Sequence, residues 1–103
     1  MTPHARRHLA ERLAAEGRGA EAEAAIAAVL ADYEASPPNA LELANARRVS
    51  ALAAEACGDR ALAIARWRSA RDDYAALDER LVALTGGNPG VAEADDRLIK
   101  LQR

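Results

Sequence analysis

The chain has few of the residues that build disulfides, aromatic cores or membrane spans. It contains one cysteine, Cys57, no phenylalanine and three aromatic residues among its 103. A single cysteine excludes an intramolecular disulfide, and nothing indicates an oxidising compartment. No apolar run is long enough to cross a bilayer. We therefore expect a cytoplasmic protein with no membrane partner, in which residues 1–103 form a single domain.

The chain also has no large excess of positive or negative charge. The formal net charge is −2, and acidic and basic residues are interspersed without a long basic run. A nucleic-acid-binding surface needs clustered Lys and Arg to neutralise phosphates. We therefore expect no nucleic-acid partner.

Alanine is what the chain has in abundance. It supplies 28 residues, and half of the chain is apolar. Alanine, leucine, arginine and glutamate all favour helix, and no alternating strand pattern occurs, so we expect an all-α fold. An alanine-rich core lets helices approach closely but buries little area. At roughly 25 cal/mol per Å² of apolar surface, such a core gives modest stability.

A passage of the sequence occurs twice. The stretch that begins at Gly17 recurs in outline from Gly58. Each copy has alanine five positions after the glycine, a large apolar residue at nine and a small or branched residue at twelve. Repetition of this kind predicts stacked helical hairpins. The matched positions are Ala22 and Ala63, Ile26 and Trp67, and Val29 and Ala70.

Caps and helix breakers divide the chain into five expected helices. Thr2 can cap the first helix, Gly58 suits a left-handed position after the third, and Asp59 can cap the fourth. The Pro-Pro and Gly-Gly stretches supply the other breaks. The expected helices run from Pro3 to Gly17, from about Ala20 to Ser36, from about Ala40 to Cys57, from Arg60 to about Thr85, and from Pro89 onward.

The fourth of these helices carries the longest apolar seam. Its spacings alternate between four and three residues, and no Gly or Pro interrupts it, so we expect one continuous helix through Leu77. The seam consists of Ala63, Trp67, Ala70, Tyr74, Leu77, Leu81 and Leu84. For the third helix we expect a buried side of Leu41, Val49, Leu52, Ala53 and Ala56.

Residues 3–36 and 44–77 resemble tetratricopeptide repeats. Matched on the two glycines, the family's small positions fall on Ala10 and Ala51, among others, and its bulky position falls on Ile26 and Trp67. Residues 78–103 follow the second repeat. They resemble an extension of its last helix and the helix that closes such arrays. The resemblance implies antiparallel helical hairpins stacked as an array.

The resemblance also implies a binding groove between the first and third helices. In that family the first helix of each pair lines a concave face, and one subclass grips a peptide carboxylate with lysine and asparagine there. We therefore expect a protein or peptide partner in this groove, with an acidic peptide as one alternative. The ligand-facing positions correspond to His4, Arg7, His8, Glu11, Asn45, Arg48, Leu52 and Glu55.

Catalytic and metal-binding patterns are weak. His4 and His8 share a helix face, and Glu11 follows one turn on. However, the first turn of a helix frays, no third histidine exists, and Arg7 opposes a cation, so we expect no metal. The acidic pairs at 72–73 and 95–96 diverge on a helix, and no nucleophile signature occurs. We expect no enzyme and no cofactor.

These observations leave three hypotheses about the function. The leading hypothesis is a non-catalytic module that binds a protein or peptide in the groove. The alternative is a self-associating structural protein, in which a homodimer forms through the C-terminal half because Val82 and Ile99 lie off the apolar seams. A small-molecule sensor or enzyme is the third hypothesis.

Overall fold

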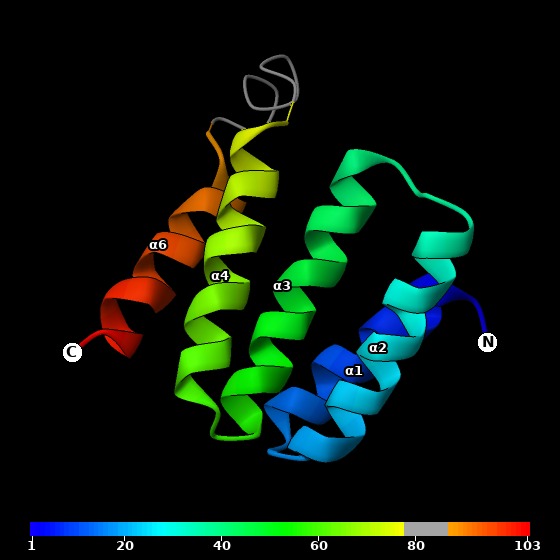
Figure 1. Cartoon of the computed structure of the whole chain (residues 1–103), viewed down its shortest axis with the longest axis horizontal. Coiled ribbons are helices and arrows are strands. Elements are labelled where there is room, and N and C mark those ends of the chain that lie inside the picture. Colours follow the sequence, from blue (N-terminus) through cyan, green and yellow to red (C-terminus); the bar gives the residue numbers. More distant parts are fainter. Residues whose placement is uncertain (78–86) are drawn as a thin grey trace.

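The structure is a computed structural model, and it describes residues 1–77 and 87–103. Within these residues the chain forms five α-helices and no strand, which confirms the predicted all-α class (Figure 1). None of the described helices combines the length and apolar character needed to cross a membrane. The helices are α1 (Pro3–Ala15), α2 (Gly19–Ala35), α3 (Ala40–Ala56), α4 (Arg60–Ala75) and α6 (Pro89–Leu101).

Local sequence sets where most of these helices begin. A side chain before the helix accepts a backbone N–H of the first turn, which satisfies a donor that the helix cannot pair internally. Four helices start in this way, from Thr2 Oγ1 to Ala5 (3.1 Å), Asn39 Oδ1 to Glu42 (2.8 Å), Asp59 Oδ1 to Leu62 (3.1 Å) and Asn88 Oδ1 to Val91 (3.2 Å).

The first and third helices end in the same way. Gly17 has a φ of 77° and Gly58 a φ of 75°. This left-handed conformation favours glycine. In both turns the next residue's N–H bonds the carbonyl five residues back, from Arg18 to Leu13 at 2.9 Å and from Asp59 to Ala54 at 3.1 Å. The repeated sequence passage therefore produces a repeated helix-ending turn.

Each helix packs on its neighbour in the chain. α2 packs on α1, α3 packs on both α1 and α2, α4 packs on α3, and α6 packs on α4. Figure 1 shows the resulting row, from α1 and α2 at one side to α6 at the other. The molecule measures 37 × 36 × 20 Å. Its shortest dimension corresponds to about two helix diameters.

The buried residues form two clusters that meet at α3. The first, here called the N-terminal core, is aliphatic and lies between α1, α2 and α3. The second, the C-terminal core, holds Trp67 and Tyr74 and lies between α3, α4 and α6. The N-terminal core consists of Ala10, Leu13, Ala22, Ile26, Val29, Ala46, Val49 and Ala53, and the C-terminal core of Ala44, Ala51, Trp67, Ala70, Tyr74 and Ala94.

The hairpin formed by α1 and α2 comes into close contact with the hairpin formed by α3 and α4 where α2 begins. A Cβ atom at Gly19 would lie 2.7 Å from the backbone carbonyl carbon of Ala56 and 2.7 Å from the backbone nitrogen of Cys57. Such distances are shorter than any van der Waals contact, so only glycine fits without a shift of the backbone. Gly19 thus permits the end of α3 to lie directly against the start of α2.

Arginine–carboxylate pairs tie the helices together around the small-residue core. They join α1 to α2, α2 to α4, α3 to α4, α4 to α6 and α3 to α6. The α1–α2 pair and the α3–α4 pair occupy equivalent places in the two repeats, because both of their partners lie at matched positions. The pairs are Arg6–Asp32, Arg66–Glu23, Arg47–Asp73, Arg71–Asp95 and Arg97–Glu55.

The predicted continuity of the fourth helix through Leu77 is wrong. α4 ends at Ala75, with Ala76 as its cap, well before the expected end near Thr85. The carbonyl of Tyr74 accepts the N–H of Leu77 at 3.2 Å and the side-chain amide of Asn88 at 2.8 Å. Leu81, Leu84 and Val82 lie outside the described residues.

The predicted buried side of α3 is correct except at the start of the helix. Val49 and Ala53 are buried, and Leu52 and Ala56 are half-buried. Leu41 was expected to be buried, but it is 38 % exposed. It lies in the first turn of α3, where it lines a pocket.

Candidate functional site

One face of α3 carries a row of five side chains, here called the α3 stripe. Their spacings of four, three, four and three residues place them on one side of the helix. The stripe lies between α1 and α6, since Arg48 at its centre bonds to both of these helices. The α3 stripe consists of Leu41, Asn45, Arg48, Leu52 and Glu55.

Arg48 connects three helices through its guanidinium group. Its Nη1 donates to Glu11 Oε2 of α1 at 3.0 Å, while its Nε and Nη2 donate to the two carboxylate oxygens of Glu93 on α6, at 2.5 and 3.1 Å. The bond to Glu93 is the main cause that raises the pKa of Arg48 above its usual value, although burial opposes it. We call these three residues the Arg48 bridge.

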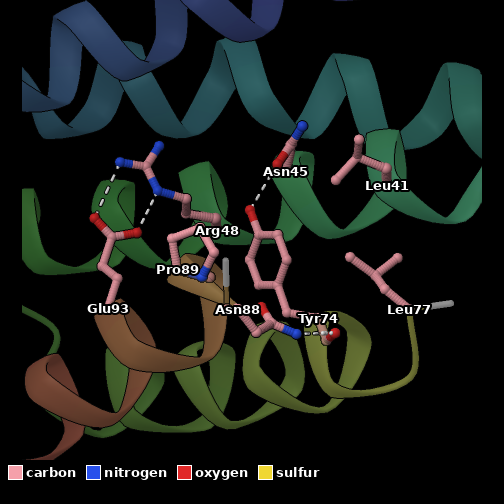
Figure 2. Close-up of a pocket in the computed structure, with 10 residues that line it drawn as sticks. Leu41, Asn45, Arg48, Tyr74, Leu77, Asn88, Pro89 and Glu93 are labelled. Atoms are coloured by element: carbon pink, nitrogen blue, oxygen red, sulfur yellow. Dashed lines mark hydrogen bonds and ion pairs between the residues drawn. The ribbon is translucent and has the colours of Figure 1, made fainter. Parts of the chain in front are cut away.

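A pocket lies on one side of the Arg48 bridge, between α3 and the start of α6. Its volume is about 390 Å³. In Figure 2 the ring of Tyr74 stands at its centre, with Leu41 and Leu77 on one side and Arg48 and Glu93 on the other. We call it the α3–α6 pocket. It is lined by Leu41, Asn45, Arg48, Tyr74, Leu77, Gly87, Asn88, Pro89, Gly90 and Glu93.

Tyr74 positions the polar wall of this pocket. Its hydroxyl donates to Asn45 Oδ1 at 2.7 Å, and burial raises the pKa of Tyr74 to about 12 (Figure 2). The hydroxyl therefore stays protonated and keeps its role as donor. A Cβ atom at Gly90 would collide with the Tyr74 ring, so glycine at the start of α6 gives the ring its place.

A second pocket lies on the other side of the Arg48 bridge. It has a volume of about 300 Å³ and lies between the end of α1 and the end of α3. We call it the α1–α3 pocket. Glu11 lines this pocket, whereas Arg48 and Glu93 line the other, so the bridge stands between the two. It is lined by Glu11, Ala14, Ala15, Leu52, Glu55, Ala56 and Arg97.

The C-terminal core holds Glu55 at the edge of this second pocket. One carboxylate oxygen accepts the indole N–H of Trp67 at 2.6 Å, and the other accepts Arg97 Nη1 at 3.1 Å. The Arg97 guanidinium carbon lies 5.9 Å from the centroid of the Trp67 ring, within cation–π range. The indole is fully buried, which confirms Trp67 as a core residue.

The structure brings together five of the predicted groove residues. Asn45 and Arg48 line the α3–α6 pocket, while Glu11, Leu52 and Glu55 line the α1–α3 pocket. His4, Arg7 and His8, the other three, line neither pocket. All three lie on α1, where His4 and Arg7 are close to Glu42 of α3 and His8 contacts His4.

Arg7 is buried instead of facing a partner. It is 7 % exposed, and its Nη2 lies 3.3 Å from His4 Nδ1 and 3.9 Å from Glu42 Oε2. Its Nε atom has no hydrogen-bond partner within the described ranges. Arg7 and Arg48 occupy matched positions of the two repeats, yet of the two only Arg48 bonds to carboxylates on two neighbouring helices among the described residues.

Sequence reasoning missed the residues that α6 brings to the site. Glu93, Pro89 and Arg97 lie near the α3 stripe only because α6 packs beside α4. No local pattern pairs Glu93 with Arg48, since 45 residues separate them. The sequence offers one sign of this site. Pro89, Glu93 and Arg97 are spaced four residues apart, which places them on a single face of α6.

No cluster of three or more His, Cys, Asp or Glu side chains suited to a metal ion occurs in the described parts of the chain. The site thus consists of a mainly apolar α3–α6 pocket and an α1–α3 pocket of mixed polarity, divided by the Arg48 bridge. Comparison of the chain with protein-family models, with curated proteins and with solved structures finds no match.

Proposed function

We propose that this chain is a non-catalytic module that binds a protein or peptide along the α3 stripe, in the cytoplasm. The observation that carries this proposal is the pair of pockets on one helix face, separated by the Arg48 bridge. A pocket with apolar walls and a few fixed polar groups is the usual form of a binding site. Leu41, at 38 % exposed, supplies apolar surface in the first pocket.

The length of the stripe favours a peptide segment over a small molecule. Leu41 and Glu55 lie near opposite ends of α3. At the helical rise per residue, their positions are about 21 Å apart along the axis. An extended chain covers that length with about six residues. One partner segment could place an apolar side chain in each pocket and cross the Arg48 bridge between them.

The polar groups of the stripe are rigid before a partner arrives. Asn45 is held by Tyr74, Glu55 by Trp67 and Arg97, and Arg48 by two carboxylates. Side chains that are already ordered lose less conformational entropy on binding, which favours affinity. The resemblance to tetratricopeptide repeats supports the same surface, because the α3 stripe includes that family's ligand-facing positions.

The expectation of an acidic partner stays a prediction. Arg48 already binds Glu11 and Glu93, so a partner carboxylate must replace one of them. If it does, the affinity falls as salt concentration rises, because a partly exposed ion pair is screened. An apolar partner that leaves the bridge intact shows little salt dependence.

A displayed peptide library tests the proposal. The full chain is immobilised, and selected peptides are measured by fluorescence anisotropy against the wild type, Leu41→Glu and Leu52→Glu. We expect each variant to weaken binding on the order of tenfold or more, because it places a charge on an apolar wall. The matched control is Ala24→Glu on the exposed side of α2, which should leave binding unchanged. Equal binding by all four proteins contradicts the proposal.

Self-association is the second candidate function, and exposed apolar residues at the C-terminal half favour it. Ile99 on α6 is 58 % exposed and Leu62 on α4 is 38 % exposed. Both lie near the end where Arg60 donates to the backbone carbonyls of Leu101 and Arg103. Light scattering over a hundredfold concentration range tests for a homodimer, which Ile99→Glu should dissociate. A monomer at every concentration excludes this function.

A further inference from the structure

Two histidines on α1 converge on one point outside both pockets. His4 and His8 are one helical turn apart, and their Nε2 atoms lie 3.1 Å from each other. The rings meet edge to face, with centroids 4.6 Å apart. Both residues are exposed, so the space beside the two nitrogen atoms is open to solvent.

The neighbours of His4 define where its proton lies. Arg7 Nη2 is 3.3 Å from His4 Nδ1. A guanidinium can only donate, so neutral His4 accepts at Nδ1 and carries its proton on Nε2, where it donates to His8 Nε2. A single proton thus lies between the two imidazole Nε2 atoms, which face each other.

We propose that His4 and His8 form a binding site for a divalent transition-metal ion such as Zn²⁺, Ni²⁺ or Cu²⁺. Imidazole suits these ions, and their bonds to histidine nitrogen are about 2.0–2.1 Å long. Two such bonds at tetrahedral or right angles place the nitrogen atoms about 2.9–3.4 Å apart. The observed 3.1 Å already lies in that range. Water fills the remaining coordination positions.

Glu42 of α3 lies beside the ring nitrogen of His4 that does not bind the metal. Its Oε2 atom lies 3.8 Å from His4 Nδ1. Before Nε2 of His4 can bind the metal, its proton moves to Nδ1. Nδ1 then no longer accepts from Arg7 Nη2 and donates towards the Glu42 carboxylate, beside which Arg7 also lies. A carboxylate in this position orients a metal-bound histidine and strengthens it as a ligand. Both imidazoles remain neutral, so the number of bound protons does not change.

The structure answers two of the objections that the sequence raised. Thr2 caps α1 by accepting the Ala5 N–H at 3.1 Å, and Glu42 contacts the His4 ring from α3, so this first turn is anchored at both ends. The positive charge of Arg7 faces Glu42 at 3.9 Å, which reduces its repulsion of a cation.

Titration with the metal ion alone tests the proposal, using calorimetry with Zn²⁺ and Ni²⁺ and electron paramagnetic resonance with Cu²⁺. We expect one ion per wild-type chain, with Cu²⁺ bound most tightly. Glu42→Gln should weaken binding by about tenfold, and loss of a ligand in His4→Ala or His8→Ala should weaken it by at least as much. The Cu²⁺ spectrum should show coupling to two nitrogen atoms.

A spacing variant provides the matched control. The double variant Ala5→His and His8→Ala keeps two histidines, but adjacent residues diverge on a helix and cannot share an ion. Ala5 is exposed, so circular dichroism should show an intact fold. The variant should bind as weakly as His8→Ala. Wild-type affinity in the spacing variant, or no binding of any of the three ions by the wild type, overturns the proposal.

Discussion

The N-terminal and C-terminal cores are built on matching positions of a repeated passage, but they use different side chains. Ile26 in one and Trp67 in the other occupy the same place in the repeat, and both are buried. Isoleucine needs no polar partner. The indole N–H of Trp67 does, and it bonds to Glu55 of α3 at 2.6 Å.

The two tyrosines at the next matched position differ in the same way. Tyr33 is half-buried against the N-terminal core. Tyr74 is buried in the C-terminal core, and its hydroxyl reaches Asn45 of α3. The indole N–H and the tyrosine hydroxyl of buried aromatic side chains need hydrogen-bond partners, and here α3 supplies them.

The difference explains why the candidate site lies at α3. Asn45 and Glu55 of the α3 stripe are fixed by the aromatic residues behind them, Tyr74 and Trp67. The aliphatic N-terminal core fixes no polar side chain in this way within the described residues. The C-terminal core therefore both stabilises the fold and orders the proposed binding surface. Five sets of substitutions, taken from the largest expected effect to the smallest, test this comparison.

Replacement of the large buried residues should have the largest effect. Trp67→Ala should lower the free energy of unfolding by about 3–5 kcal/mol, and Ile26→Ala by about 2–4 kcal/mol, because each leaves a cavity in a fully packed core. Urea unfolding followed by circular dichroism measures both. Trp67→Phe separates the lost volume from the lost N–H bond to Glu55. If Trp67→Ala unfolds at the wild-type urea concentration, the indole is not a core residue.

The contact between the two hairpins comes next. A new Cβ at Gly19 collides with the backbone at Ala56 and Cys57. Gly19→Ala should therefore destabilise the chain by about 1–3 kcal/mol. The expected sign is informative, since alanine otherwise favours a helix over glycine. Thermal unfolding measures the change. The control enlarges the exposed neighbour Ala20. Ala20→Leu should stay close to wild-type stability, within about 0.5 kcal/mol.

The matched tyrosines should respond unequally. Tyr74→Phe removes the donor to Asn45 Oδ1. This loss should cost about 1 kcal/mol. Tyr33 is only half-buried. Tyr33→Phe should therefore change the stability by less than about 0.5 kcal/mol. Urea unfolding of the two variants gives the comparison. Equal losses would contradict the view that only the C-terminal core anchors polar groups of α3.

The repeated ion pair provides a smaller contrast. Arg47 Nη1 lies 2.9 and 3.0 Å from the two carboxylate oxygens of Asp73, whereas Arg6 and Asp32 are 3.5 Å apart. Double-mutant cycles to alanine should give a coupling of about 0.5–1 kcal/mol for the first pair and about 0.2 kcal/mol or less for the second. A stronger coupling at Arg6–Asp32 reverses the predicted order.

Acid should act through the ion pair that links α2 to α4. The two hydrogen bonds from Arg66, at 2.6 and 2.7 Å, lower the pKa of Glu23 below its usual value near 4.5. This pair therefore stabilises the fold above that usual value, and the stabilisation is lost as the pH falls through the lowered pKa. Urea unfolding at several pH values should show a flatter acid decline for Glu23→Gln. Glu34→Gln, at an exposed carboxylate of the same helix, should keep the wild-type profile.

Helix starts and turns were readable from the sequence because their causes are local. Thr2, Asn39, Asp59 and Asn88 each accept a backbone N–H three residues ahead, and Gly58 adopts the left-handed conformation that its position predicted. The end of α4 at Ala75 was not readable, because no Gly or Pro interrupts the seam there, and the contact of Asn88 with the carbonyl of Tyr74 comes from 14 residues away.

The candidate site was predictable only in part. The resemblance to tetratricopeptide repeats placed Asn45, Arg48, Leu52 and Glu55 on the groove side of the third helix, and in the structure they line the two pockets. Arg48 was predicted as a groove residue open to a partner, but it already bonds to Glu11 and Glu93. That outcome depends on how α1 and α6 pack beside α3, which no spacing within one helix contains.

The sequence by itself determined where the helices start, the repeated glycine turns and the large residues of the two cores, since these follow from caps, backbone preferences and periodicity within about four residues. Only the tertiary structure decided which arginine meets which carboxylate, where α4 ends and that Tyr74 and Trp67 hold the α3 stripe. The physical reason is distance along the chain. The contacts that order the stripe join residues 12 to 45 positions apart, and packing alone brings them together.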